Sequence, residues 1–263
     1  MEVLMTELCK DLLRAPMVHG MTWHAMDVSK SPAHVAREIE NFVWEQQIPG
    51  SLSGLQIRVK PNLPWAEDHF QERVSRQPLN PPPSEAWWPF AMKANAVHKD
   101  ENEKFSHTYP ERFWPKQAGY FTLDTGEGTN AHGIRFDYGD LDDVVRLLVR
   151  EPTSRQAFLP VWFPEDTGAV EGQRLPCSLG YQFMIRDGYL NVTYHMRSCD
   201  FVRHFRDDVY MAMRLGQWVV NEMAFAWETV DDPQPPLIGK LFMTITSLHC
   251  FKGDEAKMRN GDV

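Results

Sequence analysis

Cys177 directly follows a proline and begins a stretch in which apolar and polar residues alternate. A cysteine thiolate is a strong nucleophile, and a nearby cation such as Arg197 or Arg155 would favour the thiolate form. The pair Arg197-Ser198 offers a guanidinium fork and a hydroxyl, which together suit a phosphate group. These residue types predict nucleophilic chemistry on a small phosphorylated molecule, provided that the fold brings them together.

Each of these residues also has an ordinary structural interpretation. A free cysteine is commonly a buried and inert small hydrophobe, and Arg197-Ser198 could be a surface pair at a strand end. The acids that follow (Asp200, Asp207 and Asp208) could occupy the first turn of a helix, and His249 could be a buried core histidine. Taken one at a time, the residues leave both interpretations open.

The elements expected to position this stretch are strands mixed with helices. Residues 181–186 and 189–197 predict a hairpin across the turn Asp187-Gly188. Apolar residues at helical spacing predict helices over 31–47, with Ser31 as its cap, 139–152 and 209–230, the last being the central buried helix. Strands are expected at 157–163 and 238–251. The proline- and tryptophan-rich segment 48–89 is expected to be ordered but irregular.

Composition limits the class of protein. The chain has 263 residues, a formal net charge of −9 and no internal repeat or composition break, which predicts one mixed α/β domain over 1–263. The negative charge argues against a surface for a nucleic-acid polymer. There is no apolar run of membrane-spanning length, and the first residues are not those of a signal peptide. The four cysteines are far apart without CxxC spacing, so we expect reduced thiols, no zinc or other metal site, and a cytoplasmic location.

The order of motifs across the chain resembles the thymidylate synthase family. The motifs are PC-x3-YQF from Pro176, RS-x-D from Arg197, then a helix, then a strand with H-x-aromatic at His249. Within that family, residues 176–208 are most similar to the deoxycytidylate (dCMP) hydroxymethylase branch of bacteriophages that modify their DNA. That branch has Cys, YxIRD, MRSxD, FRxD and SLHxY in this order. The corresponding residues here are Cys177, 182–187, 196–200, 205–208 and 247–251.

Upstream motifs extend the resemblance from about Ala33 to Phe251. Residues 37–40, Arg-Glu-Ile-Glu, resemble the RELE helix that carries the family's catalytic glutamate. Glu38 matches that glutamate, and Glu40 is the alternative if the alignment slips by two residues. Tyr109 with Trp114 resembles the family's Tyr-x4-Trp, and residues 152–155 resemble its PxSRR.

The resemblance implies a fold and a chemistry. The fold is a mixed α/β (α+β) sheet flanked by helices, and two such sheets pack back to back in a homodimer. Cys177 would add to C6 of a pyrimidine nucleotide, which makes C5 nucleophilic towards 5,10-methylenetetrahydrofolate. Glu38 would organise water and proton transfer, while Tyr109 and His249 would hydrogen-bond the substrate or its relay waters. The other implied substrate contacts are Arg197, Ser198, Gln182, Phe251 and Arg155 of the neighbouring subunit, and the folate contacts are Asp200 and Trp114.

Asp208 indicates the base. Thymidylate synthases have asparagine here, which pairs with the N3–H and O4 edge of uracil. A carboxylate instead accepts from the 4-amino group of cytosine and favours a protonated N3, whereas it would repel O4. In this alignment Asp207 would face away as a cap or surface residue.

Several positions depart from the family's pattern. Gln156 replaces the second arginine of SRR, and Phe251 replaces a tyrosine that would bond the sugar. Ser178 stands where synthases usually have histidine. Arg14 corresponds to the N-terminal phosphate-loop arginine by position only, and 61–89 has no clear synthase counterpart.

These observations predict a phage-encoded dCMP 5-hydroxymethylase in the cytoplasm of a bacterial cell, in which water quenches the methylene intermediate. A dCMP 5-methyltransferase that releases dihydrofolate is the alternative, and a CMP-directed enzyme is a variant. A non-catalytic nucleotide- or RNA-binding relative is a further alternative from another class. Retention of Cys177, Glu38 and Asp208 together argues against that last interpretation.

Overall fold

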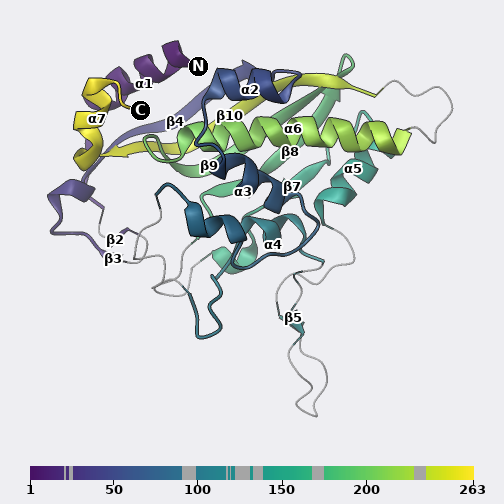
Figure 1. The fold of residues 1–263 in the computed structure, drawn as a ribbon, viewed down its shortest axis with the longest axis horizontal. Helices are drawn as coiled ribbons and strands as arrows, with labels where there is room; N and C mark the ends of the chain where they lie inside the picture. The colour runs from purple at the N-terminus through teal and green to yellow at the C-terminus, as the bar shows by residue number, and fades with distance from the viewer. Residues whose placement is uncertain are drawn as a thin grey trace.

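In the computed structural model, residues 1–20, 22–23, 26–90, 99–116, 118, 120–121, 131–132, 139–167, 175–227 and 235–263 are described. They form a six-stranded mixed sheet in the order β1-β4-β10-β9-β8-β7. The strands are β1 (Met17–Val18), β4 (Ala36–Gln47), β7 (Phe158–Pro160), β8 (Ser178–Arg186), β9 (Tyr189–Asp200) and β10 (Leu237–Phe251). Strands β9 and β10 are parallel, and the other neighbours are antiparallel. The expected mixed sheet flanked by helices is confirmed (Figure 1).

The expected hairpin forms β8 and β9. Asp187 and Gly188 both have positive φ, of 52° and 77°, as a tight hairpin turn requires. Alternate residues of β9 from Leu190 to Met196 are buried, and Phe183 is buried on β8. The turn therefore sets the register that places Cys177, just before β8, beside the end of β9.

The helix expected over 31–47 is wrong, because residues 36–47 form strand β4. Only a short 3-10 turn, η1 (Pro32–His34), precedes it. β4 pairs with β10 from Gln47 to Ala36, and its Phe42 and Trp44, two residues apart, both contact the ring of Phe205. This period of two is that of a strand with one face in the core.

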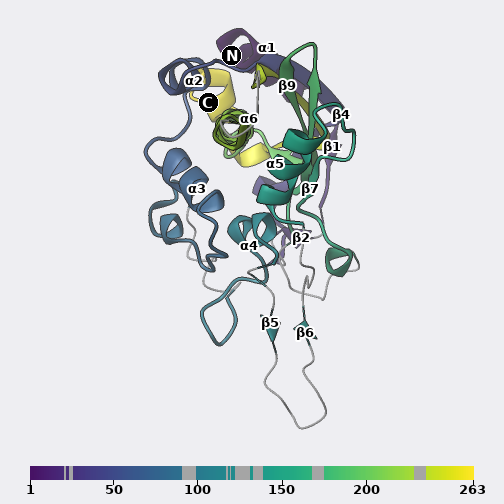
Figure 2. The same ribbon diagram turned by 90° about the vertical axis from the view of Figure 1, so that its right-hand side faces the viewer.

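Helix α6 (Phe205–Trp227) is the expected central helix. It is buried on most of its circumference, as expected for a helix between two layers. One side packs on β9 and β10, and α2 (Leu52–Val59), α3 (Trp65–Arg73) and α5 (Leu141–Arg150) contact its other sides. In Figure 2, α6 is seen end-on between the sheet and the pair α2–α3.

The segment 48–89 is more regular than expected, since it contains α2, α3 and the 3-10 helix η2 (Pro83–Trp87). Ser51 caps α2 by accepting from the Gly54 N–H. Asn62 binds Asp207 at the start of α6, which fixes where α3 begins. Helix α4 (Tyr109–Phe113) follows, with a capping box between Thr108 and Glu111.

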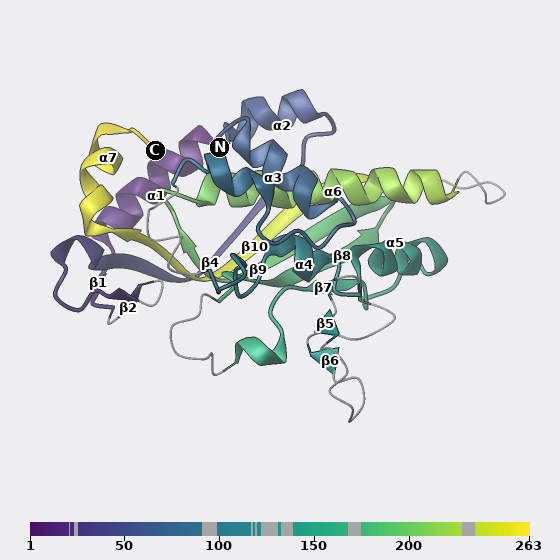
Figure 3. The same ribbon diagram turned by 60° about the horizontal axis from the view of Figure 1, so that its bottom comes forward.

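The two ends of the chain lie close together at one end of the sheet (Figure 3). They are the helices α1 (Glu2–Arg14) and α7 (Glu255–Asn260), the latter after the 3-10 turn η5 (Lys252–Asp254). The remaining elements are the 3-10 helix η4 (Pro164–Asp166) and two small pairs of strands, β2 (Thr22–Trp23) with β3 (Met26–Asp27) and β5 (Tyr120–Phe121) with β6 (Ala131–His132). None of the helices in the described part of the chain is long and apolar enough to cross a membrane.

Candidate active site

The thiol of Cys177 lies against the end of β9. The Ser198 hydroxyl donates to Cys177 Sγ at 3.7 Å, and the Arg197 N–H donates to the Cys177 carbonyl at 2.9 Å. Cys177 is half-buried, whereas Cys9, Cys199 and Cys250 are buried, and burial raises the pKa of each of those three thiols. Cys177 is therefore the cysteine best placed to react with a ligand.

The guanidinium of Arg197 fixes the segment before Cys177. Its Nε donates to the Pro176 carbonyl at 2.7 Å and its Nη2 to the Leu175 carbonyl at 3.3 Å. Its Nη1 donates to Ser198 Oγ at 3.3 Å. Arg197 and Ser198 are thus brought together with Cys177, as the motifs predict. The same guanidinium that could meet a phosphate also holds the cysteine in place.

Tyr109 is connected to Cys177 through Ser178, the first residue of β8. The Tyr109 hydroxyl is hydrogen-bonded to Ser178 Oγ at 3.0 Å, and Ser178 also bonds the hydroxyl of Tyr194. Burial raises the pKa of Tyr109, and the neighbouring charges of Cys177 and Asp208 add to this effect. The phenol therefore stays protonated near neutral pH, and it lies close to both predicted site residues.

Asp208 occupies the first turn of α6, where the Cys199 thiol donates to its Oδ2 at 3.5 Å. Burial raises the pKa of Asp208 to about 7, and Asp207 and Asp200 add to this effect while Arg73 opposes it. A carboxyl with this pKa exchanges a proton near neutrality, which suits recognition of a base edge that carries a proton-accepting nitrogen.

Asp207 is not the surface residue that the sequence suggests. Its side chain is 1% exposed, and its two oxygens accept from the backbone N–H and the side-chain amide of Asn62, each at 2.8 Å. It ties the loop before α3 to the first turn of α6, leaving Asp208 as the acid beside Cys199.

Glu38 and His249 are neighbours on adjacent strands. They are paired across β4 and β10, and His249 is paired with Asp200 across β10 and β9. Residues opposite each other in a sheet share a face, so the three side chains lie in one row. The helix on which the Glu38 assignment rests is absent, and its role as the catalytic acid, like that of Glu40, stays a prediction. The role of His249 likewise stays a prediction.

The expected folate contacts have other partners in the structure. Asp200 Oδ1 accepts from the N–H groups of Val202 and Arg203, and its Oδ2 pairs with the Arg203 guanidinium at 2.8 Å. Trp114 is 0% exposed, and its indole N–H donates to the Arg73 carbonyl at 2.8 Å. Asp200 would have to share its oxygens with a folate, and Trp114 would act only through packing, so both roles stay predictions.

Three further predicted substrate contacts have no direct contact with the Cys177 thiol among the described interactions. Gln182 donates to the Arg155 and Ala157 carbonyls at 3.0 and 3.2 Å. Arg155 is exposed on the loop before β7. Phe251 is buried at the end of β10, in edge contact with His34 and His249. The role of Arg155, whose ligand the resemblance places in a neighbouring subunit, stays a prediction.

The sequence motifs miss one charged residue of the site, Arg73, the last residue of α3. Its side chain is only 4% exposed, and its Cζ lies 3.9 Å from the centroid of the Tyr109 ring. It lies within a segment expected to be irregular, and no motif marks it. Only the helix that aims it at Tyr109 reveals it.

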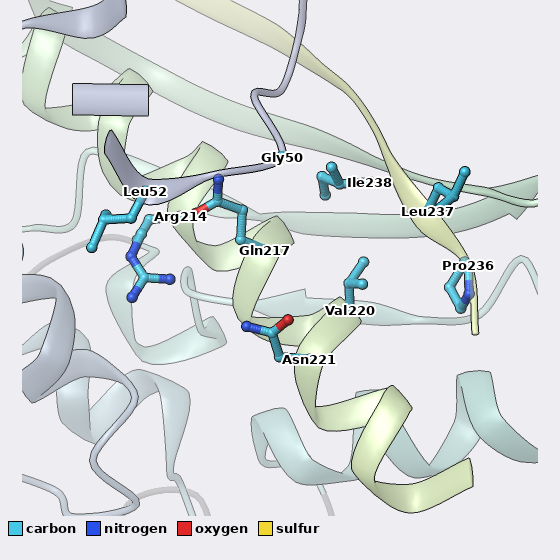
Figure 4. A pocket seen from close by; sticks show the side chains of 9 residues that line it. All are labelled: Gly50, Leu52, Arg214, Gln217, Val220, Asn221, Pro236, Leu237 and Ile238. Atoms are coloured by element: carbon cyan, nitrogen blue, oxygen red, sulfur yellow. The ribbon is translucent and has the colours of Figure 1, made fainter. Parts of the chain in front are cut away.

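A separate hollow of 370 Å³ lies beside the C-terminal half of α6 (Figure 4), lined by Leu52, Arg214, Gln217, Asn221 and Ile238 among others. None of the predicted site residues lines it. At 1.5 Å per residue, Asn221 is about 20 Å along α6 from Asp208. The hollow is therefore distinct from the Cys177 cluster.

Comparison with known proteins identifies the family. Residues 72–221, more than half of the chain, match the thymidylate synthase family. The chain belongs to the thymidylate synthase family. The match contains Tyr109, Arg155, Cys177, Arg197 and Asp208, whereas Glu38 and His249 lie outside it.

Individual thymidylate synthase relatives are similar over shorter stretches. A protein of Methanosarcina barkeri described as "Putative thymidylate synthase" is 30% identical over 108 residues, which are 36% of this chain and 48% of that protein. One of Methanothermobacter thermautotrophicus with the same description is 32% identical over 120 residues, 45% of this chain and 46% of that protein. The chain spans about half the length of the curated relatives it matches.

The raised pKa of Asp208 gives a test by unfolding. The folded protein holds this proton more tightly than the unfolded chain, whose pKa is near 3.8. Below that value the carboxyl is protonated in both states and does not change the free energy of unfolding. As the pH rises from there towards about 7, ionisation of the unfolded chain lowers the stability of the fold. In urea, Asp208→Asn should exceed wild type in stability by about 1 kcal/mol or more at alkaline pH. The advantage should shrink as the pH falls towards 4.

The exposed turn residue Asp187 supplies a matched control, because Asp187→Asn also removes a carboxylate. That variant should follow wild type across the pH range. An Asp208→Asn advantage that is independent of pH would contradict the raised pKa.

Proposed function

We propose that the protein is a dCMP 5-hydroxymethylase that uses 5,10-methylenetetrahydrofolate and water. The observation that carries this proposal is the carboxyl of Asp208, at the position where thymidylate synthases have asparagine, in the same cluster as Cys177 and Tyr109. Membership of the thymidylate synthase family supports folate-dependent one-carbon transfer to C5 of a pyrimidine nucleotide. The resemblance to the phage branch supports the hydroxymethyl product and a phage origin.

The thiolate of Cys177 adds to C6 of the base, which makes C5 a carbon nucleophile. The co-substrate supplies a methylene group to which C5 bonds, and C5 then loses its proton. Loss of tetrahydrofolate leaves an exocyclic methylene. Water adds to that methylene, and C6 releases the Cys177 thiolate. Ser198 stabilises the thiolate before attack and after release, since its hydroxyl donates to Sγ.

Asp208 recognises the cytosine edge. Its ionised carboxylate accepts from the 4-amino group and favours a protonated N3. The same anion repels O4 of uracil. A charge-assisted hydrogen bond of this kind contributes on the order of 1.5–3 kcal/mol, which is roughly ten- to a hundredfold in affinity.

A second candidate is a dCMP 5-methyltransferase, in which the folate also supplies hydride and leaves as dihydrofolate. The same residues bind and activate the base in both reactions, so the difference lies in which group reaches the methylene. The row Glu38–His249–Asp200 favours water, because the strand register sets two carboxylates and an imidazole next to one another, and such groups can orient a water molecule.

The proposal includes a homodimer in which two sheets pack back to back. Helices α2, α3 and α6 all lie on one side of the sheet (Figure 2). The opposite face presents Val43, 69% exposed, and Phe158, 39% exposed, near His195 and Gln182. Burying such a face against a second copy would also bring the exposed Arg155 to a partner's phosphate.

The nucleophile is tested by release of tritium from [5-³H]dCMP. Cys177→Ala should abolish release while still binding dCMP, because the base and phosphate contacts come from other residues. Cys9→Ala is the matched control and should retain release, since the buried Cys9 thiol lies on helix α1 and burial raises its pKa. Near-wild-type release by Cys177→Ala would contradict the assignment.

Whether water or hydride adds to the exocyclic methylene is tested by identifying the products. Incubation with dCMP and methylenetetrahydrofolate should give 5-hydroxymethyl-dCMP and tetrahydrofolate, without the absorbance rise of dihydrofolate. Mass spectrometry in ¹⁸O-water should show one labelled oxygen in the product. Stoichiometric dihydrofolate with 5-methyl-dCMP would instead establish the methyltransferase.

The dimer is tested by mixing two inactive variants. Arg155→Ala and Cys177→Ala chains should each be inactive, and heterodimers should regain activity because one of their two sites has both residues. Arg150→Ala, which changes an exposed arginine near the C-terminal end of α5, is the control and should stay active by itself. A monomer by light scattering, or no recovery under verified subunit exchange, would count against the dimer.

A further inference from the structure

Arg73 is a buried cation whose charge is not matched by an ion pair in the described part of the chain. Its Nε is buried there without a hydrogen-bond partner, and its Cζ lies 3.9 Å from the Tyr109 ring centroid. A buried guanidinium normally has a carboxylate or several acceptors around it, because its desolvation is otherwise uncompensated. The charge of Arg73 therefore acts on the groups around it.

Arg112 offers a direct contrast within the same protein. It is equally buried, at 5% exposed, and its Cζ lies 4.2 Å from the Phe163 ring centroid. Its Nη2, however, donates to Asp166 Oδ1 at 3.0 Å. Two buried arginines thus stack on aromatic rings, and one of them has a carboxylate partner. The missing partner of Arg73 is not a general property of buried arginines in this fold.

The backbone fixes where the Arg73 charge acts. Trp114, in the core, donates its indole N–H to the Arg73 carbonyl at 2.8 Å. Asn62, at the other end of the same segment, is tied to Asp207. The segment is thereby tied to the first turn of α6 at its start and to Trp114 at the end of α3, and the last side chain of α3 lies over the Tyr109 ring. From there the Arg73 charge acts on Asp208 and lowers the pKa of its carboxyl.

The groups that face Asp208 otherwise carry or can acquire negative charge. They are Asp207 on α6, Asp200 and Cys199 on β9, and the phenols Tyr109, Tyr181 and Tyr194. Each of these groups, when it is negatively charged, disfavours ionisation of Asp208. The neutral Cys199 thiol instead favours it, because it donates a hydrogen bond to the carboxylate. Arg73 opposes them.

We propose that Arg73 is the specificity-determining counter-ion of the site, which raises the ionised fraction of Asp208 and thereby favours cytosine over uracil. This inference rests on the proposed recognition of the base by Asp208. A protonated Asp208 both donates and accepts, as asparagine does, so it would fit the uracil edge. Arg73 therefore acts through Asp208 as a positioning charge and need not touch the base.

The direct test is the titration of Asp208 in the protein without ligand. Protein labelled with ¹³C at the aspartate carboxyl carbon gives a signal that is assigned by its loss in Asp208→Asn. The wild-type midpoint should lie near 7. Arg73→Met should raise the Asp208 midpoint by about one pH unit or more. Arg73→Lys keeps the positive charge, so its midpoint should stay close to that of wild type.

Arg112→Met is the matched control, because it removes a buried, ring-stacked arginine whose charge is already paired. It should leave the Asp208 midpoint unchanged even if it lowers stability. Arg73→Gln replaces Arg73→Met if the latter does not fold. An unchanged midpoint in the neutral Arg73 variants, or an equal shift in Arg112→Met, would overturn the proposal.

The preference of the enzyme for cytosine over uracil provides a second test of the role of Arg73. The ratio of kcat/KM for dCMP over dUMP should fall about tenfold in Arg73→Met at neutral pH, which corresponds to one unit of pKa. In an Asp208→Asn background the same change should have no further effect on the ratio. If wild type turns over neither nucleotide, the proposed function fails, and the titration still decides the role of Arg73.

Discussion

The buried carboxylate of Asp207 is the constraint on which the arrangement of the site depends. A charge with 1% exposure requires strong partners, and Asn62 supplies both a backbone and a side-chain donor at 2.8 Å. Burial nevertheless raises the pKa of Asp207, so these bonds only partly compensate the lost hydration. These bonds join the loop before α3 to the first turn of α6. A movement of α3 would therefore expose this carboxylate or leave it buried without hydrogen-bond donors.

The other positions of the site follow from that attachment. Helix α6 is held against β9 and β10 by its apolar side, and its first turn then directs Asp208 towards Cys199. Helix α3 carries Arg73 to the Tyr109 ring. The hairpin β8–β9 independently brings Cys177 to Ser198. Two rigid units therefore meet at Tyr109, which lies close to Cys177 from one unit and to Asp208 and Arg73 from the other.

The sequence predicts the local parts of this site well and the non-local parts poorly. The Asp187-Gly188 turn, α5 and α6 have strong local signals and form as expected. In 31–47, the apolar spacing fits a helix, but Phe42 and Trp44 also fit a strand with one buried face. Pairing with β10, some two hundred residues later, decides between the two. Arg73 is invisible to sequence reasoning for a related reason, since its importance comes from burial.

Ser178, which follows the proposed nucleophile Cys177, connects two hydroxyl groups in a neutral network that could either donate to a ligand or accept from it. Ser178 has one proton and bonds two phenols, Tyr109 and Tyr194. It can donate to one of them and must accept from the other. Burial raises the pKa of both phenols, so neither is deprotonated near neutrality.

The direction of this chain of hydroxyls therefore depends on its ends. If Ser178 donates to Tyr109, the phenol proton is free to point at a ligand acceptor. If Tyr109 donates to Ser178, its oxygen would be available to a ligand only as an acceptor. Reversing the direction of these hydrogen bonds only rotates hydroxyl groups and transfers no net charge. The network could therefore present either a donor or an acceptor to a ligand without ionising a buried group. A histidine at 178 would add a titrating group beside Cys177, whereas serine leaves charge regulation to Asp208 and Arg73.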